Sequence, residues 1–154
     1  MAEKKKSTTE LDKILGKMNP DTVEEYLKEF DSEMYEGDNA FSNYMKEVFR
    51  KHGFTQQEIF LRADMPQRYG YKIISGEKHT AQRDVILRVC LASQCNLTET
   101  NRALKLYGVS ELYSKIARDA VVITAINSRV WDIDDVNDLL RSYGFRELYG
   151  FTID

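Results

Sequence analysis

An internal repeat in the C-terminal half limits what this chain can fold into. Residues 97–113 and 133–149 lie 36 positions apart and are identical at seven of seventeen positions. Each stretch follows an apolar run that opens with Arg-Asp, as Arg83-Asp84 in the first copy and as Arg118-Asp119 in the second. Because one pattern written twice should fold the same way twice, we expect each copy to be an apolar inner helix, a turn and an amphipathic outer helix.

Residues 120–126 are the ambiguous part of the repeat. Taken alone, this β-branched run is typical of a buried strand, but the matching residues 85–91 continue naturally as a helix, so we expect a helix here too. Two copies are fewer than the roughly three that a solenoid needs, so the second copy should pack on the first as an extension of the same core. The residues expected in that contact are Val121, Val122, Ala125, Leu139 and Leu140.

The aromatic residues of the repeat are also expected to serve mainly in packing. An aromatic stripe at repeat spacing is more often core than a ligand site. The residues concerned are Trp131, Tyr107, Tyr113, Tyr143 and Tyr149.

The N-terminal forty residues are acidic and less regular. We expect a disordered tail over residues 1–9, and an acidic helical arm over residues 10–40 that ends in a linker from residue 31. An apolar stripe from Leu11 to Met18 predicts a short helix. A second helix should begin with Asn19 as its cap and Pro20 as its first residue. Its expected buried residues are Val23, Tyr26, Leu27 and Phe30.

The charge of the chain is unevenly distributed about a net value of −3. Residues 1–40 contain six Lys/Arg and eleven Asp/Glu, whereas residues 41–80 contain seven and four, a local net charge of +3. Residues 81–154 contain nine and ten. A basic segment within an acidic protein can still bind phosphate, although a local +3 taken alone favours ordinary solvated charge.

Residues 41–76 contain three helix signals in succession. A single helical face from Phe41 to His52 is closed by Gly53, in the manner of a C-terminal glycine cap. Thr55 then caps a short helix, with Glu58 at the third position of a capping box. Residues 64–66 break this helix, and a third helix runs from Gln67 to Ser75 before Gly76.

The segment from Phe54 to Gly76 resembles the XRE-type helix-turn-helix of phage repressors. The positions that carry the resemblance are Thr55-Gln56, Ile59, Ala63, Met65, Ile73 and Gly76. Three residues depart from the family pattern: Phe60 replaces a small residue, Pro66 replaces a capping Ser or Thr, and Gly70 lies inside the third helix. The resemblance implies an all-α, phage-repressor-like bundle over residues 41–115, which residues 116–154 extend by repeating residues 83–113.

The whole of residues 41–149 also looks like a narrower group of small Gram-positive bacterial proteins. These proteins pair a Tyr-Gly-Tyr recognition helix with a helical extension that opens on Arg-Asp, and they are commonly labelled as DNA-binding regulators. The resemblance therefore implies sequence-specific binding of double-stranded DNA by a transcriptional regulator.

An α-helix fits the major groove, where Arg reads guanine and Gln reads adenine through paired hydrogen bonds. Gln56, at a helix N-terminus, is placed to reach a phosphate. The expected DNA-binding residues are Gln56, Gln67, Arg68, Tyr71 and Lys72. A homodimer is expected because such readers usually span two half-sites.

The alternative function is a helical module that binds another protein, either through the helix-turn-helix scaffold or through the acidic N-terminal arm. A separate hypothesis is that this arm covers the basic face around Arg62, Arg68 and Lys72 and competes there with DNA. We expect no enzyme, because no catalytic set of side chains stands out. We expect no cofactor and no metal site, since the two histidines, His52 and His79, stand apart. Cys90 and Cys95 lack the spacing of zinc sites and should be free thiols. No run has the length of a membrane span, and we expect a cytoplasmic protein.

Overall fold

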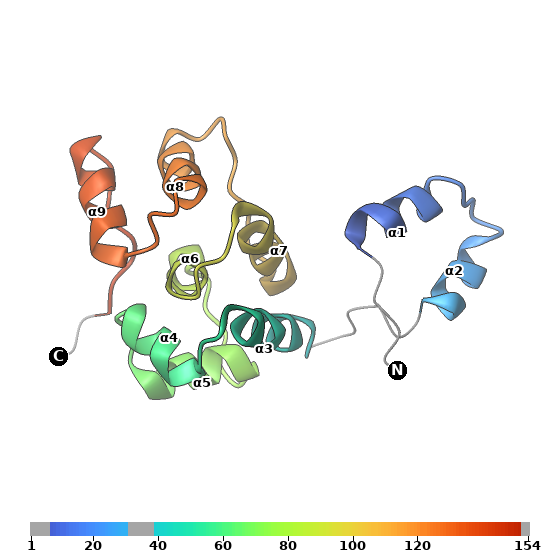
Figure 1. Ribbon diagram of the computed structural model, residues 1–154, viewed down its shortest axis with the longest axis horizontal. Helices are drawn as coiled ribbons and strands as arrows, with labels where there is room; N and C mark the ends of the chain where they lie inside the picture. The colour runs from blue at the N-terminus through green and yellow to red at the C-terminus, as the bar shows by residue number, and fades with distance from the viewer. Residues whose placement is uncertain (1–6, 31–38, 152–154) are drawn as a thin grey trace. The chain divides into compact units, whose positions relative to one another are not determined.

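The protein is all-α. A computed structural model describes residues 7–30 and 39–151, and in these ranges the secondary structure consists of nine helices without a strand (Figure 1). The chain divides into two compact units, residues 1–37 and residues 38–154. None of the helices in the described ranges has the length and hydropathy of a membrane span.

The N-terminal unit contains two short helices, α1 (Thr8–Leu15) and α2 (Val23–Glu29). Ser7 caps α1 by accepting the amide proton of Glu10 at 3.2 Å, so part of the expected disordered tail is helical. The predicted start of the second helix is wrong. The side chain of Asn19 accepts the amides of Asp21 and Thr22 in a separate turn that contains Pro20, and the helix begins only at Val23.

Burial in α2 differs from the prediction at one position. Tyr26 and Phe30 are buried, and their ring centroids are 5.0 Å apart. Leu27 was expected beside them, but half of its surface is exposed. The predicted linker over residues 31–40 lies mostly outside the described residues.

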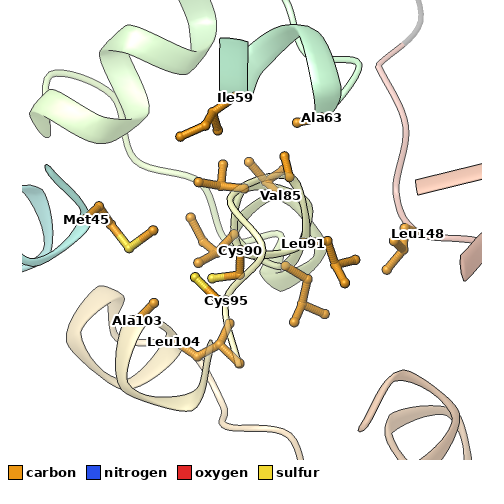
Figure 2. Close-up of a cluster of buried hydrophobic side chains, with 14 of the residues drawn as sticks. Met45, Ile59, Ala63, Val85, Cys90, Leu91, Cys95, Ala103, Leu104 and Leu148 are labelled. Carbon is orange, nitrogen blue, oxygen red and sulfur yellow. The ribbon is translucent and has the colours of Figure 1, made fainter. Parts of the chain in front are cut away.

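The second unit is built around one central helix. Its helices are α3 (Ala40–His52), α4 (Gln56–Arg62), α5 (Gln67–Ser75), α6 (Arg83–Ala92), α7 (Leu97–Tyr107), α8 (Ala117–Asn127) and α9 (Ile133–Ser142). Helix α6 packs against α4, α7 and α9, and every residue from Asp84 to Ala92 is buried. Figure 2 shows α4, α3 and α7 contributing Ile59, Met45 and Leu104 to the core around α6.

The helix boundaries in this unit follow local signals. Gly53, Gly76 and Gly108 end α3, α5 and α7 in the left-handed conformation, which glycine adopts without steric cost. Thr55 caps α4 by accepting the amide of Glu58 at 3.2 Å. The predicted helix ends at Gly53 and Gly76 and the predicted start at Thr55 are confirmed. The predicted capping box is incomplete, because the Glu58 carboxylate accepts the hydroxyl of Thr55 at 3.1 Å in place of its amide.

The two copies of the repeat have the same local structure. Residues 117–127 form the helix α8, as the comparison with the first copy predicted. Asn96 and Asp132 cap the outer helices of the two copies. Gln94 and Arg129, which directly follow the C-caps of the inner helices, have the same positive φ of 60°. The second copy packs on the first through the predicted residues: Val122, Ala125 and Leu140 are fully buried, and Val121 and Leu139 are partly buried against the core.

The Arg-Asp pairs join the two copies reciprocally. Arg118 of the second copy pairs with Asp84 of the first at 3.0 Å, and Arg83 of the first copy pairs with Asp119 of the second. Each aspartate also accepts a backbone amide of the other copy, Asp84 from Tyr149 at 2.9 Å and Asp119 from Tyr113 at 3.0 Å. This exchange of equivalent contacts relates the copies by an approximate two-fold symmetry.

The contacts between the copies keep the buried carboxyl of Asp84 ionised. Burial raises the pKa of the Asp84 carboxyl, but the hydrogen bonds from Arg118 and from the amide of Tyr149 outweigh this effect and lower the pKa below its usual value. Asp84 is therefore held ionised by residues of the second copy. A buried charge that lost such partners would strongly destabilise the fold.

The prediction that the repeat tyrosines mainly pack is wrong for three of the four. Tyr107 is buried, with its ring 4.7 Å from that of Phe41 on α3. Tyr143, the equivalent of Tyr107 in the second copy, is 66% exposed, and Tyr113 and Tyr149 are also exposed. The physical reason is that α3 covers α7, whereas no helix of residues 39–151 covers the equivalent side of α9.

Candidate nucleic-acid interface

A tight turn joins α4 to α5 and positions the helix on which most of the candidate site lies. The amide of Met65 donates to the carbonyl of Phe60 at 3.0 Å, and the side chain of Met65 is buried under the turn. Asp64 has a φ of 53°, a conformation that a short polar residue tolerates. Pro66 then precedes α5 without a capping side-chain bond. Met65 thus serves as the apolar anchor of a tight turn, as its position predicted.

Phe60 and Gly70 fit together where α4 and α5 cross. The ring of Phe60 is fully buried, and a Cβ added at Gly70 would lie 2.5 Å from it. The ring of Tyr71 meets that of Phe60 edge-on at 5.0 Å. The structure shows that Gly70 packs on Phe60.

An open groove of about 630 Å³ runs beside the outer face of α5. All five residues expected to bind DNA line this groove. They come from the start of α4 and from the exposed side of α5, and they are Gln56, Gln67, Arg68, Tyr71 and Lys72. Ile73, one position further along α5, is fully buried and faces the core. The alternation of buried and exposed positions on a nine-residue helix therefore brings these polar side chains to one surface.

Sequence reasoning missed four residues of the groove: Lys46, Ile74, Ser75 and Glu77. Lys46 comes from the exposed side of α3, and its position in the sequence did not predict that it lies near the groove residues of α4 and α5. In the part of the chain that the structure describes, no carboxylate lies within ion-pair distance of Lys46, Arg68 or Lys72. The groove thus has three cations with no ion-pair partner there and one acid, Glu77.

Two neighbouring residues prove to be structural. Arg62, placed by sequence on the basic face, donates from Nε to the carbonyl of Ala92 at 2.9 Å and stacks over the ring of Phe54. Tyr69 packs on the opposite side of α5, with its ring 5.1 Å from that of Phe151. The cationic surface therefore lacks Arg62, which the sequence placed on it, and includes Lys46 together with Arg68 and Lys72.

Two pairs of titratable groups away from the groove, His52 with Glu99 and Cys90 with Cys95, are engaged in the fold. His52 bonds through Nε2 to Glu99 at 3.0 Å. Burial raises the pKa of Glu99, but the bonds from the amide of Asn96 and from His52 outweigh this and lower it. Cys90 and Cys95 are buried free thiols, as predicted. The hydrogen bond with Cys95, together with burial, raises the pKa of Cys90 well above its usual value.

His79 is not isolated in its loop, as the sequence suggested, because its ring stacks on that of Tyr107 at 4.6 Å. Within the described residues, no group of three His, Cys, Asp or Glu side chains could hold a metal ion. The groove beside α5 combines three cations with hydrogen-bonding side chains, whereas no cation of the described residues lines the groove of about 210 Å³ at Leu61 and Met65.

Comparison with protein families, with curated proteins and with solved structures finds no match to this chain. The function must therefore be argued from the geometry of this groove.

Proposed function

We propose that this chain is a sequence-specific DNA-binding transcriptional regulator that reads double-stranded DNA with α5. The observation that carries the proposal is that Gln56, Gln67, Arg68, Tyr71 and Lys72 line one open groove on a helix whose opposite side is locked into the core. A rigid helix with one polar, exposed side fits the width of the major groove.

The residues differ in the part they play. Arg68 is exposed at the first turn of α5, has no ion-pair partner in the described residues, and can donate two parallel hydrogen bonds to guanine. Lys46 and Lys72 lie in the same groove on different helices and supply charge for phosphates. Tyr71 is held by its contact with Phe60, so its exposed edge has a fixed position.

The test is binding of the full chain to random-sequence duplex DNA over a salt series, followed by selection of the bound sequences. We expect binding that weakens as salt rises, because phosphate contacts release counterions. Arg68→Ala should cost about 1–3 kcal/mol and relax the preference at one base position, and Lys72→Ala should weaken binding to all sequences alike. Unchanged affinity and unchanged preference in Arg68→Ala would remove DNA reading from this helix.

A matched control separates groove contacts from overall charge. Lys105 is exposed on α7 and does not line the groove. Lys105→Ala removes the same charge as Lys72→Ala, so it should leave affinity nearly unchanged. Equal losses in the two variants would mean that net charge, and not the groove, determines binding.

A second candidate function, a helical protein-binding module, is favoured by an apolar feature of α4. Leu61 is 64% exposed and borders a small groove of about 210 Å³ that is also lined by Met65, Pro66 and Phe151. Five of the six residues that line this groove are apolar, the exception being Asp64, and contiguous exposed apolar surface is typical of a protein contact. No measurable binding to any duplex at low salt would reject the first function and leave this one.

A further inference from the structure

The C-terminal segment, residues 148–151, returns from the second copy of the repeat to the turn between α4 and α5. Phe151 lines the groove of about 210 Å³ together with Met65 and Pro66 of that turn. Its ring centroid lies 5.1 Å from that of Tyr69 on α5. The segment therefore supports α5 on the side opposite the candidate nucleic-acid interface, although it belongs to a different part of the chain.

A buried arginine of α6 ties this segment to the end of α4. The guanidinium of Arg88 donates to the carbonyl of Ala63, the C-cap of α4, at 2.9 Å. It also donates to the carbonyl of Leu148 at 3.3 Å and to that of Tyr149, and Figure 2 shows Ala63 and Leu148 beside α6. Arg88 is only 5% exposed, and a buried cation without hydrogen-bond partners is costly, so these acceptors are needed. One side chain thus fixes the C-terminal segment relative to the start of the turn.

Both contacts depend on positions at which the two copies of the repeat differ. Arg88 of α6 corresponds to Ile123 of α8, which has no hydrogen-bonding group in its side chain. Phe151 corresponds to Lys115, which is exposed. The exchange of equivalent contacts between the copies explains why the segment returns to α6. It does not explain the contacts with α4 and α5, which are made by the two residues that depart from the repeat.

We propose that the C-terminal segment positions α5 for reading DNA, with Arg88 and Phe151 as its positioning residues. The inference rests on the proposed function and adds that DNA affinity depends on the second copy of the repeat, from which no residue lines the groove beside α5. Helix α5 packs on α3 and α4, and Phe151 adds a support at Tyr69. Losing this support lowers the fraction of molecules in which α5 is correctly placed, and the apparent Kd for DNA rises by the inverse of that fraction.

Hydrogen exchange of the full chain, measured by mass spectrometry without DNA, tests the positioning itself. Phe151→Ala should speed exchange in residues 67–75, because the ring that packs on Tyr69 is removed, and should leave residues 97–107 unchanged. Phe151→Tyr keeps the ring and should exchange like the parent. Exchange in residues 67–75 that is the same in Phe151→Ala as in the parent would overturn the proposal.

A matched control separates positioning from a general loss of packing. Leu139→Ala removes another apolar side chain of the second copy that is partly buried against the core, and Leu139 lies on α9 and lines neither groove. It should leave exchange in residues 67–75 at the parent rate. Equal acceleration in Leu139→Ala and Phe151→Ala would mean that the second copy stabilises the fold without positioning α5, which would also overturn the proposal.

Binding to the selected duplex tests the consequence for function. Phe151→Ala should weaken binding roughly threefold to tenfold with an unchanged base preference, since every side chain of the groove is kept. Phe151→Tyr and Leu139→Ala should bind like the parent. Because coupling is reciprocal, saturating the parent with duplex should slow exchange in residues 148–151, although Phe151 lies on the opposite side of α5.

The two measurements distinguish failure of this inference from failure of the proposed function. A parent that binds no duplex rejects DNA reading, and the exchange rates without DNA still decide whether the segment positions α5. A parent that binds duplex, with Phe151→Ala binding equally tightly, would overturn the inference and leave the proposed function standing.

Discussion

Replacing Gly70 with alanine tests how α4 and α5 are fitted together. The added Cβ would lie 2.5, 2.6 and 2.7 Å from three ring carbons of Phe60, closer than real Cβ atoms approach other atoms. Phe60 is fully buried, so its ring cannot move into solvent to make room. We therefore expect α5 to be pushed away from α4, with a loss of stability.

Two opposing effects set the magnitude. Alanine is favoured over glycine in a helix by about 1 kcal/mol, and overpacking a buried site costs typically 1–3 kcal/mol. Because the overlap involves three atoms of a ring with no free space, we take the upper end of that range. The free energy of unfolding should fall by about 2 kcal/mol, which corresponds to a decrease in Tm of roughly 4–8 °C for a domain of this size.

Urea unfolding followed by circular dichroism measures this change. Gly16→Ala is the control, because Gly16 has a helical φ and its added Cβ would lie 3.4 Å from the carbonyl oxygen of Lys13, which is an ordinary van der Waals distance. It should not lower stability. In a Phe60→Ala background the sign should reverse, since the obstacle is gone and the helix preference for alanine is left. A Gly70→Ala protein as stable as the parent would refute the reasoning.

Three further predictions concern the repeat. Truncation after Lys115 removes the partner of Asp84, so the Tm should fall; an unchanged Tm would mean that the second copy is independent. The pKa of Asp84 is lowered in the folded state, so its contribution to stability is present above the unfolded value of about 4 and is lost as pH falls through the folded value. Urea midpoints between pH 7 and 3 should consequently fall, and less steeply in Asp84→Asn. Tyr107→Phe removes the oxygen that accepts the amide of Thr80 at 2.9 Å and should cost about 1 kcal/mol, whereas Tyr143→Phe at the equivalent exposed position should cost nothing measurable by the same assay.

Much of the fold could be predicted because its signals are local. Gly53 and Gly76 end helices, and Thr55 begins one, by interactions within four residues, which a sequence displays directly. The repeat allowed a helix to be predicted at residues 120–126. Their β-branched residues favour a strand, but the matching residues 85–91 of the first copy favour a helix. The groove residues of α5 were predicted for the same reason, because helical spacing alone determines which positions share a side.

What could not be predicted depends on neighbours from other parts of the chain. Each Arg-Asp dipeptide gave no sign that its members pair across the two copies. Adjacent residues on a helix point about 100° apart and do not face each other. Arg83 therefore cannot form an ion pair with Asp84, and its carboxylate partner comes from another part of the chain. Lys46 is a similar case, because only the packing of α3 on α5 brings it to the groove.

Two of the three departures of the central segment from the phage-repressor pattern, Phe60 and Gly70, are one physical feature. Phe60 adds a ring where the pattern has a small residue, and Gly70 removes the side chain that would meet this ring. The larger side chain on α4 is compensated by the absent side chain on α5, so the two helices can still approach closely. Arg68 and Tyr71 lie on either side of Gly70, which means that the residues proposed to contact DNA are positioned by this fit. Loosening the fit should therefore weaken DNA binding even though neither Phe60 nor Gly70 carries charge.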